Sequence, residues 1–180
     1  MRKGLVVRIA LSVVGLVGLF LIWYSLEYSK TFSFLETAEI ADKLGNYHES
    51  LENLDKAKAS IFICGLSDNN LKYRIDFNRG VALYRLNEIG NAQDAFIQAL
   101  GTSDFFFKAD IYYNLGHVQF YLRNYSKTTE YWIKALKANP DHFSAKYNLE
   151  WLQRNVSFET KKGSQAPKGL RGLSAPKFDS

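Results

Sequence analysis

The sequence predicts an all-α protein, in which an apolar helix near the start is followed by stacked pairs of antiparallel helices. Residues 9–24 carry no charged side chain. A pattern of small and aromatic residues recurs at an interval of 36 residues, which is typical of helix pairs that stack on one another. No long stretch shows the period-two alternation of apolar and polar residues that marks a strand.

The apolar segment Leu5–Tyr24 is interrupted only by Arg8. It has about the 20 residues that a bilayer-spanning helix needs. Trp23 and Tyr24 stand at its far end, where an interfacial aromatic belt is expected. The alternative is a cleaved signal peptide, which normally ends in a small-x-small cleavage site. This run ends instead in Trp-Tyr-Ser-Leu-Glu-Tyr, so we predict an uncleaved anchor over residues 1–26.

The flanking charges predict the orientation of this anchor. Arg2, Lys3 and Arg8 lie at its start, and Glu27 follows it. Because basic residues are retained on the cytoplasmic side, we expect a cytoplasmic N-terminus and a helical domain outside the cytoplasm. In a bacterium, the protein would be a single-pass inner-membrane protein with a periplasmic domain.

The net charge of +5 is unevenly distributed. Residues 1–26 hold three basic and no acidic residues, residues 27–160 hold fifteen and seventeen, and residues 161–180 hold five and one. The central part is therefore nearly neutral, and we predict no nucleic-acid binding, which requires a basic folded surface. A single cysteine excludes an intrachain disulfide.

The strongest copy of the recurring pattern lies between residues 108 and 140. Its small, aromatic and helix-ending residues are Ala109, Tyr112, Leu115, Gly116, Trp132, Ala135 and Pro140. This copy resembles the tetratricopeptide repeat (TPR) family, whose unit is two antiparallel helices packed closely through small residues. Gln119 and Thr128 depart from the usual Tyr and Ala. The resemblance places Gly116 and Ala135 where the two helices cross.

Two weaker copies precede this one. Tyr73–Ser103 forms a second unit with a two-residue insertion, and roughly Thr31–Ser60 forms a first. A long link containing Ile61–Cys64 joins them. Residues 143–154 are expected to form a capping helix, which gives a helical domain over residues 30–155. The expected helices are residues 33–44, 47–59, 71–86, 92–100, 105–122, 126–138 and 143–154.

Turn and capping residues lie at the ends of several of these predicted helices. Gly45 and Asn46 make the first turn, the cluster from Asp68 can cap the helix from 71, and the cluster ending in Asp104 can cap the helix from 105. Asn139-Pro140 ends the helix before it, because the residue preceding proline is disfavoured in the helical region. Asp141 is then expected to cap the final helix.

We find no catalytic or metal-binding motif in the sequence. His48, His117 and His142 have no ligand spacing and no nearby cysteine pair, so no metal site and no cofactor are predicted. Cys64 lies in an apolar run, which favours a buried, inert thiol. No glycine-rich phosphate loop or nucleophile elbow is present. We therefore predict that the protein is not an enzyme. The alternative is a hydrolase without a recognisable motif, which would use His117.

The resemblance to TPR proteins implies a concave groove, lined by the first helix of each pair, that binds a peptide or protein segment. An aromatic residue followed by Asn recurs there at Asn78, Asn114 and Asn148, and an amide can pair with a peptide backbone. The alternative is that these amides bond the neighbouring helix and only fix the stack. The predicted groove residues are Arg74, Phe77, Asn78, Tyr84, Arg85, Tyr113, Asn114, His117, Tyr121, Tyr147 and Asn148. Arg74 and Arg85 could offer one carboxylate site.

Residues 156–180 are predicted to be a disordered tail, because they have too few apolar residues to offset the entropy of ordering. Taken together, the sequence predicts a membrane-anchored interaction scaffold or assembly factor for a periplasmic complex. The arrangement of anchor, short repeat array and Gly/Pro tail also resembles the small MxaK-like proteins encoded beside MoxR-type ATPases and von Willebrand A-domain proteins. That resemblance implies a maturation factor for a metalloenzyme of the methanol dehydrogenase type, acting in a MoxR/von Willebrand A-type complex.

Overall fold

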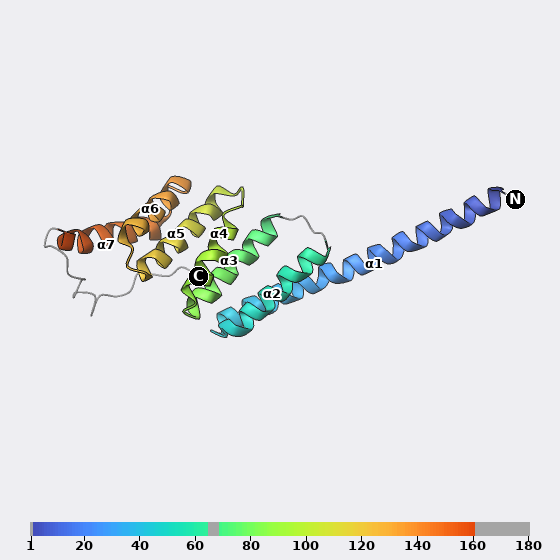
Figure 1. Cartoon of the computed structure of the whole chain (residues 1–180), viewed down its shortest axis with the longest axis horizontal. Coiled ribbons are helices and arrows are strands. Elements are labelled where there is room, and N and C mark those ends of the chain that lie inside the picture. Colours follow the sequence, from blue (N-terminus) through green and yellow to red (C-terminus); the bar gives the residue numbers. More distant parts are fainter. Residues whose placement is uncertain (1, 65–68, 161–180) are drawn as a thin grey trace. The chain divides into compact units, whose positions relative to one another are not determined.

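A computed structural model describes residues 2–64 and 69–160 of the chain, and this part is entirely helical, as predicted (Figure 1). The helices are α1 (Arg2–Lys43), α2 (Tyr47–Cys64), α3 (Asn69–Arg85), α4 (Ile89–Ala99), α5 (Phe105–Tyr121), α6 (Tyr125–Ala138) and α7 (Phe143–Thr160). They fall into two compact units, one with α1 and α2 and one with α3 to α7. The bounds of α3 to α6 agree with the predicted ones to within three residues.

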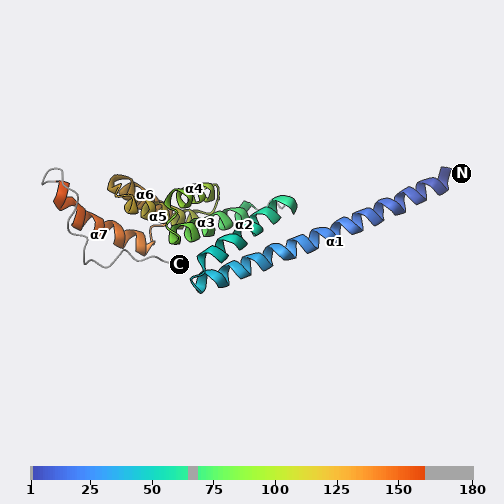
Figure 2. The ribbon, with the colours of Figure 1, turned by 60° about the horizontal axis from the view of Figure 1, so that its bottom comes forward.

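The first unit differs from the prediction in one respect: the apolar segment and the first hairpin helix are a single helix. α1 runs without a break from Arg2 to Lys43, although a separate helix from Ser33 was expected. The residues between Tyr24 and Ser33 include neither Pro nor Gly, so nothing in this stretch ends a helix. Figures 1 and 2 show α1 extending well past α2.

The α1–α2 hairpin turns at Gly45, whose φ of 76° lies in the left-handed region that favours glycine. The backbone N–H groups of Gly45 and Asn46 bond to the carbonyls of Asp42 and Ala41, which is the Schellman helix end. Asn87 and Arg123 hold the corresponding positions after α3 and α5, also with positive φ. The three helix pairs therefore have turns of the same geometry. This supports the interpretation of residues 31–60 as a first copy of the repeat.

Small residues let the paired helices of the first unit approach closely. Ala38 and Ala41 of α1 and Leu54 and Ala57 of α2 are buried. α2 continues to Cys64, past its predicted end at Ala59, because the apolar run after it extends the helix instead of forming a link.

In the second unit, glycines lie under aromatic rings where the paired helices cross. A Cβ atom on Gly80 would lie 2.6 Å from the Phe96 ring, and one on Gly116 would overlap the Trp132 indole. This confirms the predicted close crossing at Gly116. The Asp104 carboxylate accepts from the backbone N–H of Phe107 at 3.1 Å, so the predicted cap of α5 is also confirmed.

The start and end of α7 correct two expectations. His142, not Asp141, caps the helix, because the His142 Nδ1 atom accepts from the backbone N–H of Ala145 at 3.2 Å. The Asp141 backbone N–H instead bonds to the Asn139 side chain at 3.1 Å. α7 also runs past Arg154 to Thr160. The predicted tail began at residue 156, and residues 156–160 are part of this helix. The predicted cap at Asp68 and the rest of the tail, residues 161–180, lie outside the described residues.

Candidate partner-binding surface

One side of α3 presents two basic side chains with an amide between them. Arg74, Asn78 and Arg85 are exposed and lie four and seven residues apart, which places them on one helix face. We call these three residues the α3 strip. The only acidic residue of α3, Asp76, is buried, 3.8 Å from the Arg79 guanidinium. The exposed surface of α3 is therefore basic.

An aromatic pair joins α3 to α5 near the end of this strip. The rings of Tyr84 and Tyr121 meet edge to face with centroids 6.2 Å apart. The Tyr121 hydroxyl donates to the Asn87 side chain, while the residue remains 51% exposed. Burial, and then the nearby Tyr121, raise the pKa of Tyr84 to about 12. Tyr84 is thus a neutral hydrogen-bonding group at any physiological pH.

Phe77 is half-buried and packs between two elements. Its ring centroid lies 5.7 Å from that of Phe96 in α4 and 5.2 Å from that of Phe107 in α5. Because it faces neighbours on both sides, its main contribution is to hold the two hairpins together.

Three of the predicted groove residues form a buried polar cluster between α5 and α7. The Asn148 side-chain amide lies 3.0 Å from the Tyr113 hydroxyl and 3.3 Å from His117 Nε2. Asn148 and His117 are each only 1% exposed. The Tyr113 and His117 rings meet edge to face at 4.5 Å. In this structure these side chains link helices and do not line an open surface.

The three asparagines that share one place in the sequence pattern thus have three different environments. Asn78 is exposed, and Asn148 bonds the neighbouring helix. Asn114 is buried and donates to the Asp110 carbonyl of its own helix at 2.9 Å. Of the three, only Asn78 presents its amide on an exposed position.

His142 and Asp110 extend the buried cluster toward the surface. The His142 Nε2 atom lies 3.3 Å from the Asp110 carboxylate, and its ring lies 4.8 Å from Tyr113. Sequence reasoning missed the role of His142, because a histidine cap has no strong sequence signature among the usual capping residues.

Exposed aromatic side chains also occur on α7 and at the start of α5. The predicted residue Tyr147 is 58% exposed, and Phe143 lies one helical turn before it. Phe105 and Phe106 are exposed as well. Within residues 2–64 and 69–160, no group of three His, Cys, Asp or Glu side chains could hold a metal ion.

Comparison with known proteins identifies the fold. A sequence model described as the tetratricopeptide repeat matches residues 109–142, the span of the strongest predicted copy. No curated protein sequence matches the chain.

The solved structures that resemble this one include the following three. The first TPR of Spaghetti (RPAP3) bound to the HSP90 peptide SRMEEVD is 19% identical, with a TM-score of 0.60; the match covers 72% of this chain and 94% of that one. The Sgt2 TPR domain from Aspergillus fumigatus is 16% identical, with a TM-score of 0.60, over 81% and 91% of the two chains. MamA is 19% identical, with a TM-score of 0.59, over 79% and 75%.

The predicted fold is therefore confirmed: the chain has the helical-hairpin stack of TPR proteins. At these identities the likeness concerns the fold alone. The MxaK-like resemblance finds no support in these matches and stays a prediction from the sequence.

Proposed function

We propose that this protein is a membrane-anchored scaffold that binds a segment of a partner protein on the α3 strip. The observation that carries the proposal is the exposed basic face of α3, whose only carboxylate is buried. Guanidinium groups bind carboxylates through paired hydrogen bonds. The exposed Asn78 amide can donate to and accept from an extended backbone. A partner segment carrying acidic side chains suits this surface.

The aromatic neighbour of the strip supplies apolar contact area. Tyr121 is about half exposed, and its hydroxyl donates to the Asn87 side chain. Such a ring loses little conformational freedom when it is covered, and tyrosine and arginine are enriched among residues that dominate binding energy. The TPR of RPAP3, which shares the fold, was solved with a bound peptide containing two glutamates and an aspartate.

The anchoring part of the proposal depends on α1. Among the described residues, α1 alone is long and apolar enough to cross a membrane, and its apolar window has no side chain buried inside the protein. An apolar helix without protein cover is unlike the core helix of a soluble domain. The charges at its start favour a cytoplasmic N-terminus with the hairpins on the other side, in the periplasm of a bacterium.

The enzyme alternative receives no support from the environment of its named residue. His117 is 1% exposed, and its Nε2 atom faces the Asn148 amide. A general base must reach the substrate from which it takes a proton, and His117 lies behind α7. An interaction role, without catalysis, fits the site better.

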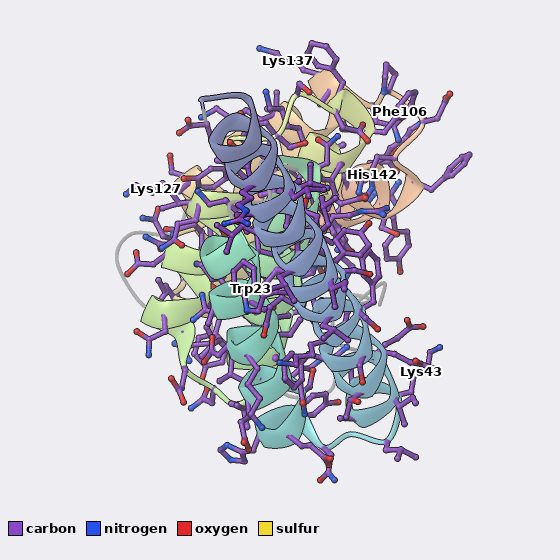
Figure 3. The ribbon with its side chains drawn as sticks, turned by 90° about the vertical axis from the view of Figure 1, so that its right-hand side faces the viewer. Trp23, Lys43, Phe106, Lys127, Lys137 and His142 are labelled. Atoms are coloured by element: carbon purple, nitrogen blue, oxygen red, sulfur yellow. The ribbon has the colours of Figure 1, made fainter. Side chains whose placement is uncertain are left out.

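The test is a pair of charge-matched variants of the full-length protein in its native membrane. Arg74→Ala/Asn78→Ala/Arg85→Ala removes the strip and two positive charges. Lys127→Ala/Lys137→Ala removes two charges from exposed positions on α6 (Figure 3). A photocrosslinking residue placed at Tyr121 reports direct contact. We expect crosslinked partner proteins with the unchanged protein and with the α6 variant, and their loss with the strip variant.

A crosslinked set that survives in the strip variant would contradict binding at this surface. If the protein were found free of membranes, or lost residues 1–26 on maturation as judged by mass spectrometry, the anchoring part would be wrong while the binding part could still hold.

A further inference from the structure

The apolar surface of α1 does not end at Tyr24. Leu26, Tyr28 and Phe32 lie beyond the apolar segment Leu5–Tyr24, and they are 57%, 42% and 45% exposed. The rings of Tyr28 and Phe32 contact each other with centroids 4.8 Å apart. Although α2 packs along this part of α1, it leaves these three side chains uncovered.

Several polar groups at the same level are paired within the protein. The hydroxyls of Thr31 and Ser60 are buried and lie 2.8 Å apart, and each lies within 3.3 Å of the Glu27 carbonyl. The Lys30 ammonium is 2.7 Å from the Glu27 carboxylate. Where water is scarce, an unpaired polar group raises the free energy of the protein. This pairing allows the hairpin base to enter a partly dehydrated layer.

The lengths of the α1 segments are compatible with a position of the hairpin base in the headgroup layer. At 1.5 Å per residue, Leu5–Tyr24 spans about 30 Å, the thickness of a bilayer's hydrocarbon core. Each headgroup layer adds roughly 5–8 Å to one side of this core. Tyr28 lies about 6 Å beyond Tyr24 along the helix and Phe32 about 12 Å beyond it. Because helical side chains lean toward the N-terminus of their helix and the Phe32 ring contacts the Tyr28 ring, both rings reach this layer. Beyond Phe32, the first exposed charged side chain along α1 is Glu36.

We propose that the base of the α1–α2 hairpin lies in the phospholipid headgroup layer, with the water boundary just beyond Phe32. The proposal rests on the proposed anchoring of α1. Because α2 runs antiparallel to α1 and Ser60 meets Thr31, the helix end from Ile61 to Cys64 lies nearer to the membrane than Ser60 does. The hairpin thus stands at the lipid surface with its base immersed.

The experiment places a fluorescent label at single cysteines in full-length protein reconstituted into phosphatidylcholine vesicles. The native thiol is first removed by Cys64→Ser. The label is then attached at Leu16→Cys, Phe32→Cys or Ile40→Cys, all of which are exposed on α1, and Tyr28→Cys provides a second test position. Nitroxide lipids quench from within the bilayer, and dithionite in the water reduces the label chemically.

We expect the labels at residues 28 and 32 to be quenched by a headgroup-level nitroxide and to react with dithionite several-fold more slowly than the label at residue 40. The Leu16→Cys label should be protected throughout. Equal, rapid reduction at residues 28, 32 and 40 with protection at residue 16 would overturn this inference and leave the anchoring intact. Rapid reduction at residue 16 as well would show that α1 is not in the membrane, which is the failure of the proposed anchoring.

Discussion

The indole Nε1–H of Trp132 donates a hydrogen bond to the backbone carbonyl of Tyr113, 3.1 Å away, across the contact between α6 and α5. The indole lies over Gly116, and the bond fixes its position there. A buried indole N–H needs such a partner. Together, the close approach at Gly116 and this bond tie the α5–α6 hairpin to the cluster that holds α7.

Gly116→Ala should destabilise the second unit. The added Cβ would overlap the Trp132 indole, and overpacking of a core typically costs about 1–3 kcal/mol. Gly90→Ala is the matched control, since a Cβ there meets nothing within 4 Å, and it should be neutral or slightly stabilising. Urea unfolding followed by tryptophan fluorescence measures both. Equal stability of the two variants would refute the crossing argument.

The buried hydroxyl pair of the first unit should be coupled. Thr31→Ala or Ser60→Ala alone leaves the other hydroxyl buried with one partner fewer, at a cost of about 1–3 kcal/mol, and the double variant should lose less than the sum. Urea unfolding of the detergent-solubilised protein by circular dichroism gives the four stabilities. Thr37→Ala, at an exposed hydroxyl bonded only within its own helix, is the control. Strict additivity would mean that the hydroxyls act independently.

Asn148 and Asn78 should separate the structural and binding roles of the repeated asparagines. Asn148→Ala removes the amide that faces the Tyr113 hydroxyl and should lower the free energy of unfolding by about 1–3 kcal/mol. Asn78→Ala, at an exposed position, should change stability by less than about 0.5 kcal/mol but weaken partner capture. Chemical unfolding and the crosslinking assay together make the comparison. The reverse assignment of effects would invalidate the α3 strip.

The cap of α7 can be checked at two adjacent residues. His142→Ala removes the side chain that accepts from the Ala145 N–H and should cost about 0.5–2 kcal/mol. Asp141→Ala should cost little, and His142→Asn should recover part of the loss, because asparagine is a good cap. Thermal unfolding ranks the three variants. A larger effect at Asp141 would restore the expectation from the sequence.

Tyr84 should make stability depend on alkaline pH. Its pKa is raised from 10.0 to about 12 in the folded chain, chiefly by burial, so the folded state favours the protonated phenol. This contribution is fully present below pH 10 and is lost as the pH rises toward 12. We expect the urea midpoint to fall more steeply above about pH 10 in the unchanged protein than in Tyr84→Phe. Parallel curves for the two proteins would exclude the shift.

Local sequence signals were sufficient for most helix boundaries. Asp104, the Asn139-Pro140 pair and Gly45 affect only the backbone next to them. Their effect can therefore be predicted without knowing the tertiary structure. The continuity of α1 could also have been predicted, because no helix-breaking residue lies between Tyr24 and Ser33. The helix was instead expected to be interrupted, because the membrane segment was expected to end at Tyr24.

The candidate surface was harder to predict, because exposure depends on tertiary packing. Tyr113 and His117 have the spacing of groove residues, yet α7 covers them, and Asn148 of α7 faces inward against both. The pattern alone cannot indicate which face of a terminal helix pair is closed by the helix that follows it. Arg74, Asn78 and Arg85 remain exposed, and nothing in their own sequence spacing distinguishes them from the covered set.

The unbroken course of α1 has a mechanical consequence. With no hinge between the apolar segment and the hairpin, the two must tilt together. A helix whose apolar length exceeds the local hydrocarbon thickness tilts to bury it. Under the proposed anchoring, α1 would lean further in a thinner bilayer and carry the hairpin with it. The angle at which the first hairpin leaves the lipid surface would therefore follow bilayer thickness.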